Sequence, residues 1–251
     1  RLIPIIDAGV KVENGYDVYE EGVENHYFCQ REDGSDFVAA VWPGDTHFPD
    51  FLNKDARKWF GDKYSFLISQ GIEGFWNDMN EPASFKGPLP DDVQFADEDD
   101  TVILHKDAHN IYGHCMAMAT KDGWLKYDGR RPFIITRAAY AGTQRYALVW
   151  TGDNQSIWAH LQMAIPQLCN LGLSGFSYAG TDVGGFGADT TKELLARWVQ
   201  VGCLSPFFRN HSAQGTRKQE PWQFDKELLE IYRKYVELRY HLLPYIYDCF
   251  F

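Results

Sequence analysis

The sequence predicts an α/β fold with parallel strands, closed as a (β/α)8 TIM barrel. Short apolar runs alternate with longer amphipathic segments along the chain, and each apolar run ends in polar residues. Near-continuous apolar runs are typical of strands that are buried on both faces of a parallel sheet. A barrel brings all its strand ends to one catalytic face, whereas a doubly wound sheet gathers them at one switch point. The barrel is favoured because polar side chains follow every run and no GxGxxG follows the first.

Six apolar runs are expected to form the strands of this barrel. A complete barrel has eight strands, so two further strands are expected before Arg1, in a longer parent protein. An open barrel has two unpaired sheet edges, so the isolated chain is expected to fold poorly and to show little activity. The six runs are residues 2–6, 74–76, 132–136, 147–150, 175–179 and 206–208.

Amphipathic segments between these runs predict five helices. Asn53 is a favourable N-cap for the first helix, and Thr190 or Thr191 can cap the fourth. Residues 86–105, which contain KGPLPDD and DEDD, are interpreted as an excursion loop. The whole chain, residues 1–251, is interpreted as one catalytic barrel domain. The predicted helices span residues 54–70, 107–126, 156–171, 190–202 and 226–243.

The composition is that of an acidic globular chain with a substantial core. Hydrophobic residues make up 45% of the chain and charged residues 24%, which argues against disorder. Asp and Glu number 35 against 24 Lys and Arg, a net charge of −11. An acidic protein repels phosphate backbones, so no nucleic-acid partner is expected. No apolar run approaches the length of a membrane span, so no membrane partner is expected either.

The five cysteines predict free thiols in a reducing compartment. They are odd in number, widely spread and without CxxC or Cys/His ligand spacing, which argues against disulfides and zinc. We therefore expect no metal and no cofactor, and a cytoplasmic location. Self-association as a homo-oligomer stays open. The cysteines are Cys29, Cys115, Cys169, Cys203 and Cys249.

Eight side chains at or just after the predicted strand ends form a candidate reaction site. Four aspartates and a glutamate stand there without a nucleophilic Ser or Cys, which suggests glycoside hydrolysis. That reaction needs one ionised carboxylate at the anomeric carbon and one protonated carboxylic acid at the leaving oxygen. Chemistry alone does not identify the pair, and Glu81 competes with Asp78. The eight residues are Asp7, Asp78, Glu81, Arg137, Asp153, Asp182, Arg209 and His211.

Two other functions fit part of this set. Three of the aspartates with His211 could bind a divalent cation. Two arginines would then lie beside the metal, and no HxH or HExxH spacing supports it. A non-catalytic sugar-binding module would use the aromatic residues, which make up 16% of the chain. Such a module has no need for two carboxylates in opposite protonation states.

Five motifs in order resemble those of glycoside hydrolase family 31. The stretch that resembles the family signature is GFWNDMNEPASF at 74–85. The resemblance covers nearly the whole chain and implies a retaining α-glycosidase on a TIM barrel, with a β-sandwich before the barrel and β-domains after it. The other motifs are VWPGDTHFPDF at 41–51, RPFIITRAAYAGTQRYALVWTGDNQSIW at 131–158, GTDVGGFG at 180–187 and PFFRNHSAQGTRKQEPW at 206–222.

The resemblance implies a role for each candidate residue. Asp78 corresponds to the family nucleophile and Asp153 to the acid/base, which leaves Glu81 a structural role. Asp7 lies near the site without an assigned role. The remaining residues are expected to bind the sugar in subsite −1. Its polar ring is Arg137, Asp182, Arg209 and His211, and its apolar walls are Ile5, Trp42, Trp76, Met79, Trp150 and Phe186.

The implied reaction releases terminal non-reducing α-linked glucose from oligosaccharides by double displacement. Asp78 attacks the anomeric carbon, and Asp153 acts first as acid and then as base on water. Ile5 and the WNDMNEP motif resemble α-glucosidase members. The family also contains α-xylosidases, transglycosylases, sulfoquinovosidases and α-glucan lyases, and these alternatives stay open. WNDMNEPASFKGPLP resembles bacterial members that act on malto- or isomalto-oligosaccharides, which agrees with a cytoplasmic location.

Overall fold

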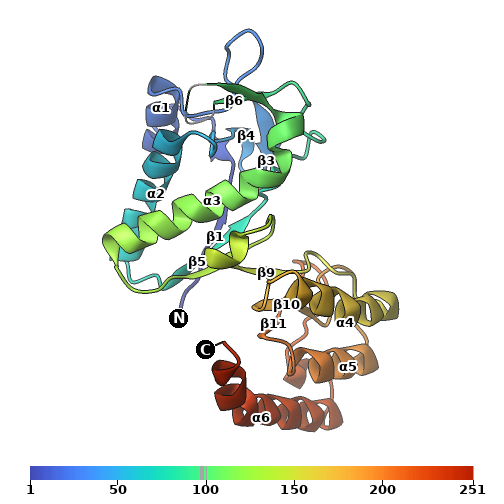
Figure 1. Ribbon diagram of the computed structural model, residues 1–251. Coiled ribbons are helices and arrows are strands. Elements are labelled where there is room, and N and C mark those ends of the chain that lie inside the picture. Colours follow the sequence, from blue (N-terminus) through green and yellow to red (C-terminus); the bar gives the residue numbers. More distant parts are fainter. Residues whose placement is uncertain (97–98, 100, 251) are drawn as a thin grey trace. The chain divides into compact units, whose positions relative to one another are not determined.

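The computed structural model describes residues 1–96, 99 and 101–250 (Figure 1). The chain divides into two compact units, Arg1–Ala147 and Leu148–Phe251, which we call the N-terminal and C-terminal units. Each unit is built on three parallel strands whose connections contain helices. This is the arrangement that alternating apolar runs and amphipathic segments predict.

The N-terminal unit contains a parallel sheet in the order β1-β5-β8. Its pairing places Asp7 opposite Asp78 and Trp76 opposite Ile135. Because parallel strands end at one edge of a sheet, the polar residues that follow β1, β5 and β8 gather at that edge. The strands are β1 (Ile5–Asp7), β5 (Gly74–Asp78) and β8 (Phe133–Thr136), close to the predicted runs.

Two long helices, α2 (Lys54–Ser69) and α3 (His105–Tyr127), pack together beside this sheet (Figure 1). Asn53 caps α2 as predicted, since its side chain accepts hydrogen bonds from the N–H groups of Asp55 and Ala56. The helices touch at Gly61 and Gly123. A Cβ atom on Gly123 would lie 2.3 Å from the Gly61 carbonyl oxygen, so this crossing requires glycine.

Several elements of the N-terminal unit were not predicted, namely one helix of eight residues and strands of two to four residues. The predicted loop 86–105 contains an antiparallel pair, β6 with β7, although its residues 97, 98 and 100 lie outside the described residues. The unpredicted elements are α1 (Asp17–Glu24), the antiparallel sheet β2 (Val10–Lys11), β4 (Gly44–His47) and β3 (Ala39–Val41), β6 (Gln94–Ala96), β7 (Val102–Leu104) and the 3-10 turn Thr143–Arg145.

The C-terminal unit contains parallel strands in the order β9-β10-β11, with Asp182 opposite Arg209. Thr191 caps α5 as predicted, because its hydroxyl accepts a hydrogen bond from the N–H of Leu194. The elements are β9 (Leu148–Trp150), α4 (Trp158–Leu173), β10 (Ala179–Val183), α5 (Lys192–Gly202), β11 (Phe207–Asn210), the 3-10 turn Pro221–Gln223 and α6 (Lys226–Asp248).

Two strands begin several residues later than predicted: β1 begins at Ile5 instead of Leu2, and β10 is displaced further. The apolar run 175–179 suggested a strand, but β10 begins only at Ala179. The residues before it end helix α4 instead. Gly175 adopts a φ of 87°, its N–H donates to the carbonyl of Gly172, and the N–H of Phe176 donates to the carbonyl of Leu171. This pair of hydrogen bonds is a Schellman cap, which uses the start of the predicted strand.

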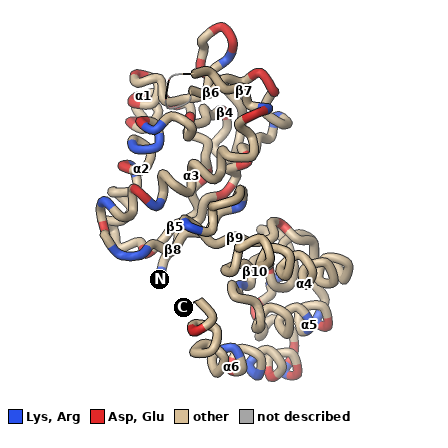
Figure 2. The backbone as a smooth tube through the Cα atoms, viewed as in Figure 1, with Lys and Arg blue, Asp and Glu red and all other residues tan. Residues whose placement is uncertain are grey.

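Charged residues occur along the backbone of both units, with acidic and basic positions interspersed (Figure 2). All five cysteines are free, as predicted, and Cys169 and Cys249 are exposed. None of the helices in the described part of the chain is both long and apolar enough to cross a membrane. Among the same residues, no three His, Cys, Asp or Glu side chains are grouped to hold a metal ion.

Candidate active site

The predicted nucleophile, Asp78, is the last residue of β5 in the N-terminal unit. Its side chain is 19% exposed. Its Oδ1 atom lies 3.1 Å from Arg137 Nη1 and accepts a hydrogen bond of 3.0 Å from the N–H of Met79. A neighbouring guanidinium and a backbone N–H both stabilise the ionised carboxylate. Asp78 therefore has surroundings that suit a carboxylate nucleophile.

The turn after Asp78 is held by buried amide side chains. Met79 adopts a φ of 53°, a left-handed conformation that is uncommon for residues other than glycine. Asn80 is fully buried and clamps this turn to the end of β8. Its Nδ2 donates to Thr136 Oγ1 at 2.9 Å, and its Oδ1 accepts from the N–H of Ala138 at 3.0 Å. The sequence prediction missed Asn80, although it lies within the signature-like motif.

Arg137 contacts the last residue of β5 and two residues of the segment that follows it. Its Nε donates to Glu81 Oε1 at 2.8 Å and its Nη2 donates to Glu81 Oε2 at 2.9 Å. Nη2 also lies 3.1 Å from the sulfur of Met79, and Nη1 faces Asp78. One guanidinium is thus shared between two carboxylates, and the predicted structural residue Glu81 lies within the site.

Asp7 lies beside the nucleophile, opposite Asp78 on the neighbouring strand. The pKa of Asp7 is raised to about 6, because burial and, to a smaller extent, the charge of Asp78 raise it more than the charge of Arg137 lowers it. Below that pH the Asp7 carboxyl is neutral and can donate a hydrogen bond. A protonated Asp7 also relieves the repulsion that two adjacent carboxylates would otherwise suffer.

The apolar residues predicted for this unit differ in exposure. Trp76 is buried in β5, Met79 is buried in the turn, and Ile5 is half exposed on β1. Trp42, between β3 and β4, is 75% exposed, and its ring meets that of Phe85 edge to face with centroids 4.9 Å apart. Phe85 was not predicted as a site residue, although the signature-like motif ends on it. These two exposed rings are available to contact a ligand.

In the C-terminal unit, Asp182 and Arg209 form a buried ion pair. Asp182 is fully buried, and its Oδ1 accepts a hydrogen bond from Arg209 Nη2 at 2.7 Å. The Arg209 guanidinium also lies 5.3 Å from the ring centre of Trp150 and 5.4 Å from that of Phe207. A guanidinium over an aromatic face is attracted by the ring's negative surface. Three predicted residues, Trp150, Asp182 and Arg209, therefore lie together.

His211 stacks on Phe186, with ring centres 4.9 Å apart and planes inclined by 29°. Burial lowers the pKa of His211 to about 4, and the positive charge of Arg209 contributes to this shift. The imidazole is therefore neutral at ordinary pH. A neutral imidazole offers one donor and one acceptor, a combination that suits a sugar hydroxyl.

Two amide side chains that the sequence prediction missed hold the Phe186 loop. Gln219 is 2% exposed, and its Nε2 donates to the carbonyl of Gly185 at 2.8 Å. Asn210 Nδ2 donates to Gln219 Oε1 at 2.9 Å and to the carbonyl of Val183 at 2.7 Å. This network ties the end of β10 to the segment after β11.

The predicted acid/base, Asp153, lies in a tight turn after β9. Gly152 adopts a φ of 79°, and the N–H of Asn154 donates to its carbonyl at 2.9 Å. Asn154 is buried, and its Oδ1 accepts a hydrogen bond from the Thr151 hydroxyl at 2.5 Å. The Asp153 side chain itself is exposed, where it can meet a ligand.

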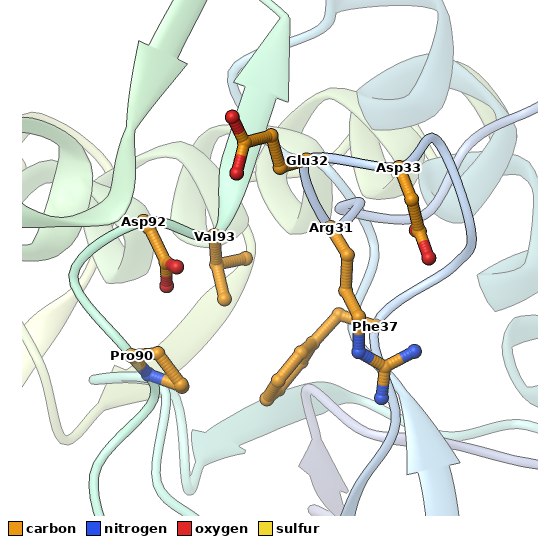
Figure 3. Close-up of a pocket in the computed structure, with 7 residues that line it drawn as sticks. All are labelled: Arg31, Glu32, Asp33, Phe37, Pro90, Asp92 and Val93. Carbon is orange, nitrogen blue, oxygen red and sulfur yellow. The ribbon is translucent and has the colours of Figure 1, made fainter.

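A cavity of about 550 Å³ in the N-terminal unit contains none of the predicted site residues (Figure 3). In the wall of this cavity the Arg31 guanidinium lies 5.4 Å from the ring centre of Phe37. Three carboxylate residues also line the cavity. The cavity is lined by Arg31, Glu32, Asp33, Phe37, Pro90, Asp92 and Val93. The cavity is therefore separate from the strand-end residues that carry the predicted chemistry.

Comparison with curated proteins gives relatives along the whole chain. It is 50% identical over 252 residues to Alpha-glucosidase 2 of Bacillus thermoamyloliquefaciens. This alignment covers 100% of this chain and 32% of that protein. It is 40% identical over 260 residues to Neutral alpha-glucosidase C of Mus musculus, covering 100% of this chain and 28% of that one. The chain thus spans about a third of the length of these relatives.

Solved structures give the same fold. A glucosidase II alpha subunit in a Glc1Man2-bound form is 37% identical with a TM-score of 0.90, over 97% of this chain and 27% of that one. A Family 31 alpha-glucosidase from Bacteroides thetaiotaomicron is 40% identical with a TM-score of 0.84, over 97% and 40%. These matches confirm the predicted α/β barrel class.

A family model described as "Glycosyl hydrolases family 31 TIM-barrel domain" matches residues 1–249. The match includes all five motifs and every strand-end residue of the candidate site, and it agrees with the relatives and the solved structures. The chain therefore belongs to glycoside hydrolase family 31.

Proposed function

We propose that the full-length protein is a retaining α-glucosidase that removes terminal non-reducing glucose from α-linked oligosaccharides. The observation that carries the proposal is the contact between Asp78 and Arg137 at the end of β5. It keeps a carboxylate ionised at the position where the family signature requires a nucleophile. Relatives named as alpha-glucosidases, up to 50% identical to this chain, support glucose as the sugar.

In the proposed reaction, Asp78 attacks the anomeric carbon while Asp153 donates a proton to the departing oxygen. A covalent glycosyl-enzyme forms through the Asp78 carboxylate. Asp153 then removes a proton from water, which attacks the same carbon and restores Asp78. Two inversions at one carbon retain its configuration. The exposed position of Asp153 in its turn agrees with a group that meets both the leaving oxygen and water.

The remaining residues are proposed to bind the glucosyl unit. The Asp182–Arg209 pair presents hydrogen-bonding atoms, and its burial supports a fixed geometry for them. Neutral His211, stacked on Phe186, can pair with a hydroxyl group. Exposed Trp42 offers an aromatic face to the apolar side of the sugar. Hydrogen bonds that strengthen as the ring flattens would lower the barrier to glycosyl transfer.

The test is hydrolysis of p-nitrophenyl α-glucoside beside the α-xyloside by the full-length protein and by its Asp78→Asn variant. We expect turnover of the glucoside that falls by on the order of 10⁴-fold or more in the variant, the scale seen when a nucleophile is removed. Asp62→Asn is a matched control, because Asp62 pairs with Lys126 in the same unit, away from the strand ends. Proton NMR of the first-formed sugar would show the α-anomer.

Three results would contradict the proposal. Preference for the xyloside would make the protein an α-xylosidase, and an unsaturated sugar product would make it a lyase. Turnover that survives Asp78→Asn would remove Asp78 from the nucleophile's role.

A further inference from the structure

Glu81 forms a fork with Arg137 in the candidate site. Its two carboxylate oxygens accept separate hydrogen bonds from Arg137 Nε and Nη2, at 2.8 and 2.9 Å. Two parallel bonds of this kind fix the plane of the guanidinium as well as its distance. The Glu81 side chain is 35% exposed and that of Arg137 is 18% exposed, so the pair is partly shielded from water.

The fork determines which atom of Arg137 reaches Asp78. With Nε and Nη2 bound to Glu81, the remaining nitrogen, Nη1, faces Asp78 Oδ1 at 3.1 Å. The main chain of Arg137 is fixed as well, because its N–H donates to the carbonyl of Asn77 at 3.0 Å. Arg137 is therefore held both at its main chain and at its guanidinium. The hydrogen bonds to Glu81 oppose rotation of the guanidinium away from Asp78.

Of the three groups, only Asp78 changes its charge during the proposed reaction. Asp78 begins as a carboxylate and becomes a neutral ester when its oxygen bonds to the anomeric carbon. The departing oxygen takes the proton of Asp153 and leaves as a neutral hydroxyl, so the negative charge passes to the Asp153 carboxylate. Arg137 would then face an uncharged ester. Glu81 keeps a counter-charge on Arg137 throughout, so the partly buried guanidinium is neutralised in both states.

We propose that Glu81 is a positioning residue, which holds the Arg137 guanidinium against Asp78 and so keeps the nucleophile oriented. Glu81 also offsets part of the positive charge of Arg137, so that Arg137 does not fully neutralise Asp78. This inference rests on the proposed glycosidase function, because it gives Glu81 a purpose in forming the glycosyl-enzyme. Glu81 itself need not touch the sugar or the reacting atoms. It acts on them through Arg137.

The test uses the full-length protein with Glu81→Gln, Arg137→Met and the double variant. We expect Glu81→Gln to lower kcat/KM for p-nitrophenyl α-glucoside by on the order of 10²-fold, the cost of a small misplacement of a reacting group. If Glu81 acts through Arg137, the double variant should lose no more activity than Arg137→Met alone. Glu21→Gln is the matched control, because Glu21 pairs with Lys63 on helices away from the strand ends and should leave kcat/KM unchanged.

A second readout is the acid limb of the pH profile of kcat/KM. Among the described residues of this unit, the charged groups next to Asp78 include Asp7 on β1 and Arg137 after β8, and Glu81 is linked to Asp78 through Arg137. Replacing Glu81 with Gln removes a negative charge close to Asp78, and this charge effect favours ionised Asp78 and moves the acid limb to lower pH even when the guanidinium shifts by a small distance. Arg137→Met should move it to higher pH. A residue that only supported the fold would lower activity without displacing the limb.

Several outcomes overturn the inference. It fails if Glu81→Gln keeps wild-type kcat/KM, or if the losses of the two single variants multiply in the double variant. Should Glu81→Gln not fold, Arg137→Lys replaces it, because lysine keeps the charge but cannot form the fork. An Arg137→Lys variant with unchanged kcat/KM would then contradict the inference as well. A wild-type protein without α-glycoside turnover refutes the proposed function, whereas an active wild type with an indifferent Glu81→Gln variant refutes only this inference.

Discussion

Asp182 and Arg209 stand opposite each other on β10 and β11, and a hydrogen bond of 2.7 Å joins Asp182 Oδ1 to Arg209 Nη2. The parallel register creates this ion pair. Asp182 is fully buried, and the Arg209 side chain is only 15% exposed. The pair thus supports both the packing of the C-terminal unit and the proposed binding of sugar hydroxyls.

Replacing Asp182 with Asn should destabilise the protein strongly. The amide has the same size but no charge, so the Arg209 guanidinium loses its buried carboxylate at a cost of about 3–5 kcal/mol. Thermal unfolding of the full-length protein would measure this as a large fall in Tm. Asp189→Asn is the control, because Asp189 is exposed and accepts a hydrogen bond only from the N–H of Arg217 among the contacts described. Equal Tm values for the two variants would contradict the role of the pair.

The stability of the protein should fall on acidification partly because of His211. Its pKa is lowered to about 4 in the folded protein, whereas an unfolded histidine titrates near 6.5. Between these two values the unfolded chain binds a proton that the folded chain does not, so the free energy of unfolding falls as pH falls from about 6.5 to about 4. The Tm of the His211→Gln variant should therefore fall less than that of the wild type when the pH is lowered over this window. Parallel Tm-against-pH curves for the two proteins would contradict the prediction.

Gln219→Leu should loosen the loop that carries Phe186. Leucine cannot donate to the carbonyl of Gly185 or accept from Asn210, and the buried polar groups left behind cost about 1–3 kcal/mol. Because Phe186 packs on His211, we expect a higher KM for the glucoside together with a lower Tm. Gln223→Leu, at an exposed position in the turn Pro221–Gln223, is the control. A lower Tm without any change in KM would show that the Phe186 loop does not contribute to substrate binding.

Alanine should have opposite effects at two helical glycines. At Gly123 a Cβ atom would lie 2.3 Å from the carbonyl oxygen of Gly61, so Gly123→Ala should force α2 and α3 apart and cost about 1–3 kcal/mol or more. Gly172 in α4 has no atom within 4 Å of an added Cβ. Gly172→Ala should stabilise the helix by about 0.5–1 kcal/mol. Urea unfolding of both variants measures the two effects, and a neutral Gly123→Ala would show that the helices can separate freely.

The sequence predicted those parts of the fold that repeat over enough residues to show a period. All six parallel strands and five helices arise from runs of this kind, and caps at Asn53 and Thr191 marked two helix starts. The start of β10 was misplaced because Gly175 and Phe176 belong to an apolar run that is typical of a strand, whereas in the structure they complete the cap of helix α4. The antiparallel sheet β2-β4-β3 was not predicted, because two of its three strands, VK and GDTH, are not continuous apolar runs.

The candidate site shows a similar division. Charged residues at strand ends were visible because they interrupt apolar runs. The amides Asn80, Asn210 and Gln219 were missed, because an amide side chain at a strand end or in a loop is typical of ordinary surface until its partners are known. Chemistry could not separate Asp78 from Glu81. In the structure the two differ by partner, since Glu81 forms the fork with Arg137 while Asp78 receives the remaining nitrogen.

The pairing of Asp7 with Asp78 across β1 and β5 has a consequence for how this site can change over time. Point substitutions can alter the charge of either residue, yet they cannot separate the two positions, because backbone hydrogen bonds set them side by side. A one-residue insertion inside β1 would turn every later side chain of that strand to the opposite face. Insertions are therefore tolerated between strands and excluded within them, so this lineage can lengthen its loops to meet new substrates while the spacing of its acidic residues is inherited intact.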